Sequence, residues 1–409
     1  MTNSFNLDKT SFTALAKPGL VVPIFLKVFG GNETPVGIYE KVSASKSGTF
    51  LLESAEQGVW SRFSFIGVSS RASFIQGTGE LKVSKPELAL PDGGALPSSP
   101  LEAIKLVQSS WQISDQPDLP PLTSGLVGLF SWDVIREIEN LPLVPTKDYE
   151  HPNIHLEMVQ DIIVMDHKTS SLLLVSNIYC DSQMDYADAY DEAVERISAL
   201  LELLSSSVAP TLSVLESYSA PQLRHRTENA DFLASIEKAK EYVVAGDVFQ
   251  VVISQRFDID VTARPIDVYR VLRSLNPSPY MYLLNYADEH GEYSVVGSSP
   301  EALVKVTGKE VIMHPIAGSR PRSADAIEDE KLAESLIEDK KERAEHLMLV
   351  DLARNDLLKV CEPSSVNVTQ FMKIERFSHI MHLVSTVEGQ LVSDKTAVDV
   401  FTATFPAGT

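Results

Sequence analysis

The segment HPIAGSRPR, residues 314–322, places a histidine and two arginines around a run of very small residues. The middle of the segment, Ala317-Gly318-Ser319, carries almost no side-chain bulk. Such a run is typical of a tight surface turn, but it also lets a ligand approach the backbone closely. The residue types alone leave both interpretations open, and they assign no ligand contact to the two arginines.

A second group of polar residues falls within a helix that the pattern predicts over 325–360. The second half of this helix, AEHLMLVDLARNDLL, is apolar nearly all round, which is typical of a buried helix. Glu345, His346, Asp351 and Arg354 would then be buried, and buried charges are paired or bind an ion. Internal pairing, for instance between Asp351 and Arg354 three residues apart, is an alternative interpretation.

Carboxylates recur along the same predicted helix at positions 338, 342 and 345. This spacing puts them on one helical face, and such oxygen ligands suit Mg²⁺, which takes one or two carboxylates with water and substrate oxygens. A solvated acidic face is the simpler interpretation for Glu338 and Glu342. Glu345, at the start of the apolar half, is the better candidate ligand. Motifs with zinc spacing, C-x-x-C and H-E-x-x-H, are absent.

Two further positions could transfer protons. Glu301 follows a predicted strand and a small-residue turn in VVGSSPEAL, where it could be a general acid or part of a surface turn. His379 and His382 lie in the apolar run SHIMHLVSTVEG, where a histidine is most often packed in a core. The nucleophile elbow, the P-loop and the dinucleotide fingerprint are missing, which argues against ATP and NAD chemistry.

The elements that must position these residues fall into two halves. The Ser- and Pro-rich stretch 205–229 separates the halves, and 84–100 reads as a long surface loop. In the first half, GTFLLESA, SRFSFIGVSS and RASFIQGT are predicted to be consecutive strands, 153–180 a hairpin and 185–204 a helix.

The second half is predicted to open with a helix that ends at Gly246. A strand over 248–261 follows, and then four more strands in YMYLLNY, YSVVGSS, EALVKVTG and KEVIMHPIAG. Connections of hairpin length favour an antiparallel sheet. The expected fold class is therefore α+β.

Composition limits the partners. The chain has 409 residues, 44% of them hydrophobic, which suits two or three domains. A net charge of −21 argues against nucleic acid as the main partner but allows a small anionic ligand in a local basic pocket. Two cysteines, no recognisable signal peptide and only short apolar runs predict a cytoplasmic protein with no membrane contact.

Several segments occur together in one order: AGDVFQVVISQRF, NPSPYMYLLNY, VVGSSPEALVKV, HPIAGSRPR, KKERAEHLMLVDLARNDL and ERFSHIMHLVSTVEG. Together they closely resemble the large subunit of anthranilate synthase, in the chorismate-utilising enzyme family. LLESAEQGVWSRFSFIG resembles the regulatory segment of that subunit. The resemblance implies a layered α/β sandwich with large, mostly antiparallel sheets and outer helices. It places an N-terminal domain over 15–205 and a chorismate-binding domain over 225–409.

The resemblance also implies a reaction, a lyase step that begins tryptophan biosynthesis. Ammonia adds at C2 of chorismate as the C4 hydroxyl leaves, and elimination of pyruvate then gives anthranilate. By motif position, Glu345 is implied as a ligand of the Mg²⁺ cofactor, Glu301 as the general acid and His382 as the histidine of pyruvate elimination. The implied substrate contacts are Ala317, Gly318 and Ser319, where the family usually has threonine in place of this serine.

Two positions distinguish related enzymes. Aminodeoxychorismate synthases carry a nucleophilic lysine where Ala317 stands, and isochorismate and salicylate synthases carry a water-activating lysine where Gln250 stands. Neither side chain here can act as a nucleophile or base, which favours external ammonia as the attacking group. The resemblance implies that a separate glutaminase subunit supplies this ammonia.

Feedback inhibition by L-tryptophan is implied by two segments of the chain. A buried carboxylate can hold the ammonium group, and a Pro-Tyr-Met wall suits an indole ring. Ordinary strand packing is the alternative interpretation of these segments. The implied tryptophan-binding residues are Glu53, Ser54, Asn276, Pro279, Tyr280 and Met281.

The last residues, FTATFPAGT, differ from the family pattern, which continues with LSGAPK and a further subdomain. That subdomain carries a second Mg²⁺-binding glutamate and the residues that grip the chorismate carboxylates. We therefore expect an incomplete active site in a chain that ends at Thr409. The contrasting hypothesis is a non-catalytic protein that binds tryptophan or serves in assembly.

Overall fold

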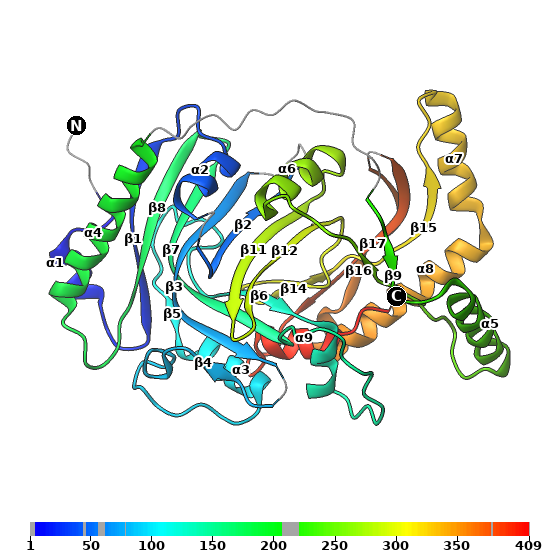
Figure 1. Cartoon of the computed structure of the whole chain (residues 1–409), viewed down its shortest axis with the longest axis horizontal. Helices are drawn as coiled ribbons and strands as arrows, with labels where there is room; N and C mark the ends of the chain where they lie inside the picture. Colours follow the sequence, from blue (N-terminus) through cyan, green and yellow to red (C-terminus); the bar gives the residue numbers. More distant parts are fainter. Residues whose placement is uncertain are drawn as a thin grey trace. The chain divides into compact units, whose positions relative to one another are not determined.

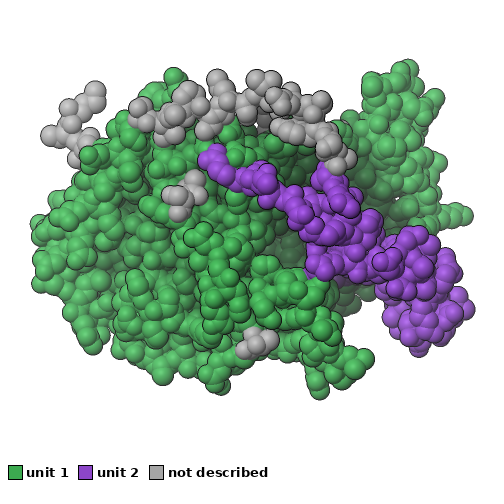
Figure 2. Space-filling view, viewed as in Figure 1, with its two compact units in different colours: residues 1–207, 265–406 green, residues 208–264, 407–409 purple. Residues whose placement is uncertain are grey.

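The computed structural model describes residues 5–43, 46–55, 62–77, 79–206, 221–377 and 379–408. Contacts along the chain group it into two compact units, one of residues 1–207 and 265–406 and the other of residues 208–264 and 407–409 (Figure 2). Every candidate site residue except Gln250 belongs to the first unit. This grouping differs from the domains predicted over 15–205 and 225–409, and those bounds stay a prediction.

A ten-stranded sheet forms most of the first unit, in the order β12-β11-β2-β3-β7-β8-β1-β5, with β4 paired to β3 and β6 to β7 (Figure 1). All pairs are antiparallel except β1 with β5. The strands are β1 (Leu20–Phe29), β2 (Thr49–Glu53), β3 (Phe63–Gln76), β4 (Lys82–Val83), β5 (Gln112–Ile113), β6 (Leu126–Phe130), β7 (Ile154–Asp166), β8 (Ser171–Tyr179), β11 (Tyr280–Asp288) and β12 (Gly291–Ser299).

Helices cover this sheet because each presents an apolar stripe to it. A shared core cluster holds α1 (Lys9–Leu15), α2 (Pro35–Val42), α4 (Tyr186–Ser205) and α6 (Pro265–Leu275) against the strands (Figure 1). A second cluster contains residues of α3 (Pro100–Ser110) and α9 (Ala397–Thr404). Two short 3₁₀ turns, η1 (Pro86–Leu88) and η2 (Trp132–Glu137), lie in the connections. β8 is buried along its whole length, which explains its nearly continuous apolar sequence.

A five-stranded antiparallel sheet completes the first unit, and β17 is its central strand. β17 (Ile380–Gln390) pairs with β14 (Glu310–Met313), β15 (Ile316–Pro321) and β16 (Asn367–Arg376), while β13 (Lys305–Thr307) pairs with β14. The helices α7 (Ala326–Glu338) and α8 (Lys340–Leu358) pack against this sheet, and η3 (Pro363–Ser365) leads into β16. This sheet and its helices carry most of the candidate catalytic residues.

The second unit contains α5 (Asn229–Ala245) and a two-stranded pair of β9 (Arg224–His225) with β10 (Phe257–Asp258). Gly246 ends α5 with a φ of 82°, as the sequence predicts. The strand predicted over 248–261 is wrong except at β10, because only the two residues of β9 pair with it. None of the described residues of this unit is buried.

Three further predictions need correction. SRFSFIGVSS and RASFIQGT form the single strand β3. The expected turn between them is replaced by shifts in the pairing register with β7 around Ser69 and Ser70. KEVIMHPIAG contains two strands, β14 and β15. The helix predicted over 325–360 is two helices, because Asp339 ends α7 and its carboxylate caps the N–H groups of Lys341 and Glu342.

The predicted burial of the second half of that helix is confirmed for His346 and wrong for Asp351 and Arg354, which are exposed. They form the alternative ion pair, with Nη1 of Arg354 3.1 Å from Oδ1 of Asp351. The expected hairpin over 153–180 and the helix over 185–204 are confirmed by β7, β8 and α4. The α+β class with large, mostly antiparallel sheets is confirmed. Over the described ranges, every helix is too short or too polar to span a membrane.

Candidate active site

The small residues of the 314–322 segment lie on β15, beside the central strand β17. Ala317 is opposite Leu383 and Ser319 is opposite His382, and the register shifts between them so that Gly318 bulges out of the ladder. Gly318 has a φ of 75°, which a residue with a side chain rarely adopts. A Cβ at this position would lie 3.3 Å from the Glu342 side chain, so the backbone needs a glycine for both reasons.

His382 uses this bulge to fix its ring. Its Nδ1 lies 3.0 Å from the carbonyl oxygen of Gly318. Because a carbonyl can only accept, Nδ1 carries the hydrogen and donates it, which leaves Nε2 able to accept a proton. The ring also meets Phe377 edge-on, with centroids 5.6 Å apart. His382 is therefore held in one orientation beside Gly318 and Ser319.

The first turns of α8 lie against the same bulge. Glu342, which the sequence favours as a solvated residue, contacts Gly318 and has a side chain only 18% exposed. Glu345 follows one turn later and is half-buried, and side chains three residues apart in a helix share a face. Glu338 belongs to α7, so the three carboxylates do not share one helical face.

His346 anchors this part of α8 from the inside. It is fully buried, and its Nε2 lies 2.6 Å from the Ser385 hydroxyl on β17. The same hydroxyl accepts the backbone N–H of Met372 at 2.9 Å. Burial lowers the pKa of His346, and a contact with the backbone of Ala317 opposes this effect. The ring therefore ties α8 to β17 as a neutral packing group.

The described residues contain no group of three or more His, Cys, Asp or Glu side chains arranged to hold a metal ion. Mg²⁺ does not require such a group, because it often binds one or two carboxylates together with water and substrate oxygens. Glu345 has no ion pair or hydrogen bond with any other described residue. The unpaired carboxylate of Glu345, one turn from Glu342, therefore fits a hydrated Mg²⁺.

Glu301 follows β12, at an end of the ten-stranded sheet. The residue as a whole is exposed, yet the protein around the carboxyl desolvates it and raises its pKa to about 7. Its backbone is fixed by Ser299, whose hydroxyl donates to the Glu301 carbonyl at 3.0 Å. No hydrogen bond or ion pair in the described parts of the chain joins Glu301 to His382 or Gly318.

The two segments implied for tryptophan binding lie side by side. β2 and β11 are antiparallel neighbours, and Glu53 is directly opposite Met281. Glu53 is buried and accepts the Tyr269 hydroxyl at 2.7 Å, and Nε of Arg273 lies 3.2 Å from its carboxylate. Burial, followed by the charge of Glu53, raises the pKa of Tyr269. Glu53 is therefore already paired with a guanidinium group.

The remaining residues of these segments surround the end of the strand pair. The hydroxyl of Ser54 is buried and has no hydrogen-bond partner among the described residues. Tyr280 is 44% exposed and Pro279 is half-buried. Asn276 is fixed by the Ser298 hydroxyl, which donates to its carbonyl at 2.7 Å. An unpaired buried hydroxyl beside an exposed tyrosine leaves polar and aromatic groups available to a ligand.

The two arginines of the 314–322 segment hold structure together. Arg320 donates to Asp339 at 2.8 Å, and Arg322 donates to Asp329 at 2.9 Å and to the Phe377 carbonyl at 2.7 Å. The hydrogen bond from Arg322 is the largest cause that lowers the pKa of Asp329 to about 2.

Sequence reasoning missed Glu342, Tyr269 and Arg273 as neighbours of the candidate residues. The helical spacing of Tyr269 and Arg273, four residues apart, places both on one face of α6. That spacing could have indicated a polar pair, but their partner Glu53 lies more than 200 positions away in the chain. Only the pairing of β2 with β11 brings them together.

The chain is similar to known proteins over nearly its whole length. A family model described as chorismate binding enzyme matches residues 49–409. Anthranilate synthase component 1 of Arthrobacter globiformis is 48% identical over 97% of this chain and 76% of that protein. The same component of Mycolicibacterium smegmatis is 44% identical over 98% of this chain and 77% of that protein.

Solved structures extend the comparison. The crystal structure of anthranilate synthase component I from Streptococcus pneumoniae matches with a TM-score of 0.73 and 30% identity, over 93% of this chain and 80% of that one. The menaquinone-specific isochorismate synthase of Escherichia coli matches with a TM-score of 0.62, over 96% of this chain and 75% of that one. At 13% identity, this second match shows a shared fold alone.

Proposed function

The chain belongs to the family of chorismate-binding enzymes and, within it, to the anthranilate synthase component I proteins of tryptophan biosynthesis, and we propose that it makes anthranilate from chorismate and ammonia. In the first step ammonia adds to C2 of chorismate and the C4 hydroxyl leaves as water. In the second step the C2 proton and the enolpyruvyl group leave, which gives anthranilate and pyruvate. The observation that carries the proposal is the junction of β15, β17 and α8.

At this junction, Gly318 lets a substrate approach the backbone while its carbonyl orients His382. With Nδ1 donating to that carbonyl, Nε2 of His382 can take the C2 proton as the enolpyruvyl group departs. Ser319 is the exposed residue opposite His382 and offers a hydroxyl to the substrate. Ala317 is buried and contributes backbone only.

Glu301 suits the role of general acid because its pKa of about 7 keeps a large fraction protonated at neutral pH. In the first step its proton goes to the departing hydroxyl, which leaves as water. The added ammonia then gives up a proton, which restores the balance of charge. An ordinary exposed glutamate, with a pKa near 4.3, is protonated in only about one molecule in 500 at pH 7.

Mg²⁺ is the proposed cofactor, with Glu345 as its ligand on this chain and Glu342 beside it. The ion would hold the ring carboxylate of chorismate and neutralise its negative charge. The protein contribution is the fixed position of α8, which His346 ties to β17 through the Ser385 hydroxyl.

Ammonia is the proposed nucleophile because Ala317 and Gln250 stand where lysine acts in related enzymes. A glutaminase subunit is the proposed source of the ammonia. Free ammonia at high pH should replace that subunit, because the uncharged form is the one that attacks.

Feedback inhibition by L-tryptophan is also proposed, at the end of the β2–β11 pair. Glu53 would share its buried carboxylate between Arg273 and the ligand ammonium group, and the free hydroxyl of Ser54 could accept or donate beside it. Pro279, Tyr280 and Met281 would form the wall for the indole ring, with Asn276 fixing the turn before them.

The test is the identity of the product. The chain is incubated with chorismate, Mg²⁺ and an ammonium salt at high pH, and the products are separated and followed by anthranilate fluorescence. We expect anthranilate and an equal amount of pyruvate, and loss of both in Glu301→Gln and His382→Ala. Formation of isochorismate or aminodeoxychorismate as the final product would contradict the proposed reaction.

Tryptophan binding is tested separately by calorimetry. We expect L-tryptophan to bind the parent chain and to bind at least tenfold more weakly to Ser54→Ala, which removes the free hydroxyl and adds no bulk. Equal affinity of both chains would place any tryptophan site elsewhere.

A further inference from the structure

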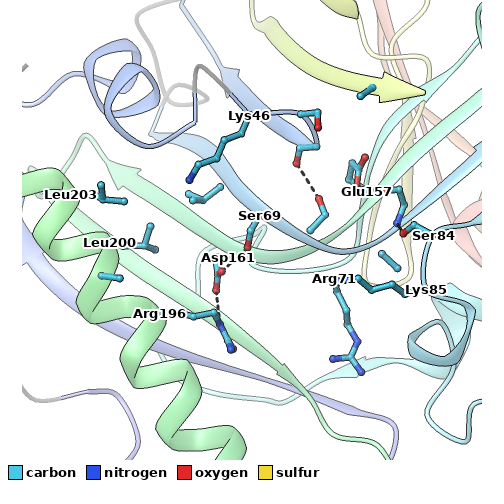
Figure 3. Close-up of a pocket in the computed structure, with 18 residues that line it drawn as sticks. Lys46, Ser69, Arg71, Ser84, Lys85, Glu157, Asp161, Arg196, Leu200 and Leu203 are labelled. Carbon is cyan, nitrogen blue, oxygen red and sulfur yellow. Dashed lines mark hydrogen bonds and ion pairs between the residues drawn. The ribbon is translucent and has the colours of Figure 1, made fainter. Parts of the chain in front are cut away.

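A hollow of about 540 Å³ lies beside β3, β7 and α4, and none of the predicted catalytic or tryptophan-binding residues lines it (Figure 3). The Asp161 carboxylate in this hollow is already paired, because Nε of Arg196 lies 3.3 Å from it. The end of the hairpin of β16 and β17 differs, because Phe377 there contacts His382 and is itself held by Arg322. Residues with no assigned role can therefore act on the proposed reaction at this hairpin.

Phe377 lies on the same face of the hairpin as His382. Glu375 of β16 is directly opposite His382 of β17, and side chains two residues apart along a strand share a face. Phe377 and His382 are therefore diagonal neighbours, and their ring centroids are 5.6 Å apart with the planes at 66°. Such an edge-on arrangement is favourable for aromatic pairs, so the Phe377 ring packs against one flank of the imidazole.

The orientation of the His382 ring decides which of its nitrogens is free. Nδ1 lies 3.0 Å from the Gly318 carbonyl oxygen and donates its hydrogen, which leaves Nε2 as the acceptor. A half-turn of the ring about its bond to Cβ would place a ring carbon where Nδ1 now lies and would break this hydrogen bond. The neighbouring Phe377 ring opposes that turn, since the imidazole would have to move past it. One polar and one aromatic contact thus fix the ring together.

The backbone of Phe377 is held on both of its polar groups. Its N–H donates to the Ile380 carbonyl at 2.8 Å, and its own carbonyl accepts Nη1 of Arg322 at 2.7 Å. The backbone N–H of Arg322 also donates to the His379 carbonyl at 3.1 Å. Arg322 therefore binds the chain before and after the end of the hairpin, and the direction of the Phe377 side chain follows from this fixed backbone.

Asp329 of α7 fixes the guanidinium of Arg322 in turn. Asp329 is only 7% exposed, and its Oδ1 accepts Nε of Arg322 and the backbone N–H of Ser323, each at 2.9 Å. Nε of Arg376 lies 3.4 Å from its other oxygen. The rigid fork of an arginine can serve a carboxylate and a carbonyl at once, whereas a lysine has a single nitrogen on a flexible stem. Arg322 thus joins α7 to the hairpin in one geometry.

We propose that Phe377 and Arg322 are positioning residues for His382. The Phe377 ring keeps the imidazole in the orientation that leaves Nε2 free, and Arg322 holds the backbone that carries the Phe377 ring. The proposal rests on the proposed function of His382, which takes the C2 proton through Nε2. The orientation of the ring can nevertheless be measured without the reaction.

The first experiment is ¹⁵N NMR of the histidine rings of the whole chain at pH 8, with His382→Ala to assign the signals of His382. We expect the hydrogen on Nδ1 in the parent and exchange between Nδ1 and Nε2 in Phe377→Ala. Phe377→Tyr, which keeps an aromatic ring, should behave as the parent. Phe371→Ala, which removes an exposed ring from β16, is the matched control and should also behave as the parent. Equal His382 signals in Phe377→Ala and the parent would overturn the proposal.

Two further variants separate positioning from stability. Arg322→Lys and Asp329→Asn both weaken the pair between these residues, so both should lower the urea midpoint. Asp329→Asn leaves the guanidinium bound to the Phe377 carbonyl, whereas Arg322→Lys removes the fork that holds it. We expect exchange of the His382 hydrogen in Arg322→Lys and not in Asp329→Asn. The same His382 signals in both variants would overturn the role of Arg322.

The second experiment measures anthranilate formation with chorismate, Mg²⁺ and an ammonium salt. Phe377→Ala should lower kcat about tenfold or more and change KM for chorismate by less than about threefold, because a misplaced base affects the chemical step more than binding. Phe377→Tyr should restore most of kcat. An active parent with an unchanged kcat in Phe377→Ala would overturn the proposal. A parent that makes no anthranilate bears on the proposed function alone, and the NMR comparison then decides the positioning of His382 by itself.

Discussion

Replacement of Glu301 with glutamine should stabilise the folded chain at high pH while it removes the proposed acid. Burial raises the pKa of Glu301 from 4.5 to about 7, so between these values the folded chain binds more protons than the unfolded chain. The stability of the parent therefore falls as pH rises through this window, and the full loss is present above about pH 7. Glutamine stays neutral at every pH and carries no such loss.

The magnitude follows from the same values. A pKa raised from 4.5 to about 7 corresponds to an upper bound of about 3 kcal/mol, at about 1.4 kcal/mol for each pH unit. More than a third of the Glu301 surface is exposed, so water screens much of this effect. We expect a gain of about 1 kcal/mol in the free energy of unfolding at pH 8, and about a quarter of that gain at pH 5.

The assay is urea unfolding of the parent and Glu301→Gln at pH 5 and at pH 8. Glu334→Gln, which removes an exposed carboxylate from α7, is the matched control for the loss of one negative charge. We expect the difference between the two variants to grow from pH 5 to pH 8. An equal gain at both pH values, or a gain shared by Glu334→Gln, would refute desolvation of Glu301 as its cause.

Three further predictions concern β15 and the helices beside it. Gly318→Ala should destabilise the chain by about 1–2 kcal/mol more than the strain of a positive φ alone. The control is Gly308→Ala, which measures that strain because Gly308 has a φ of 60° and open space around it. Equal thermal shifts of the two variants would exclude the close approach to Glu342. Asp329→Asn should be less stable than the parent at neutral pH, because Arg322 lowers the pKa of Asp329 to about 2. The difference in urea midpoint between parent and variant should shrink as pH falls from about 4 to about 2. A constant difference would contradict the pairing of Asp329 with Arg322. Glu345→Gln should raise the Mg²⁺ concentration needed for half-maximal anthranilate formation at least tenfold, and an unchanged Mg²⁺ dependence would exclude Glu345 as a ligand.

Prediction from sequence succeeded where one segment carries the whole pattern. The two β-rich runs of β7 and β8, the stripe of α4 and the glycine after α5 are local signals, and the structure confirms them. Prediction failed where one continuous helix and two shorter helices differ only in the hydrogen bonds around one residue. Asp339 begins a new helix because its carboxylate accepts two backbone hydrogen bonds, in a stretch where the helical period continues without glycine or proline.

The strand predicted over 248–261 failed for a different reason. A strand is stable only with a partner, and a pattern of apolar residues does not specify that partner. The candidate sites show the same limit. Glu53 could be recognised from its segment, but Tyr269 and Arg273 became its neighbours only through the pairing of β2 with β11.

The position of Gly318 explains why the segment 314–322 combines small residues with arginines and lies beside His382 of β17. Its bulge turns a carbonyl toward His382, and its missing side chain admits Glu342 of α8. Arg320, two residues later, holds Asp339, and Asp339 in turn begins α8. One strand therefore sets the orientation of the histidine and the place where the acidic helix starts. A lysine at Ala317 would have to fit a buried position between these contacts, so the identity of that residue affects packing as well as the choice of nucleophile.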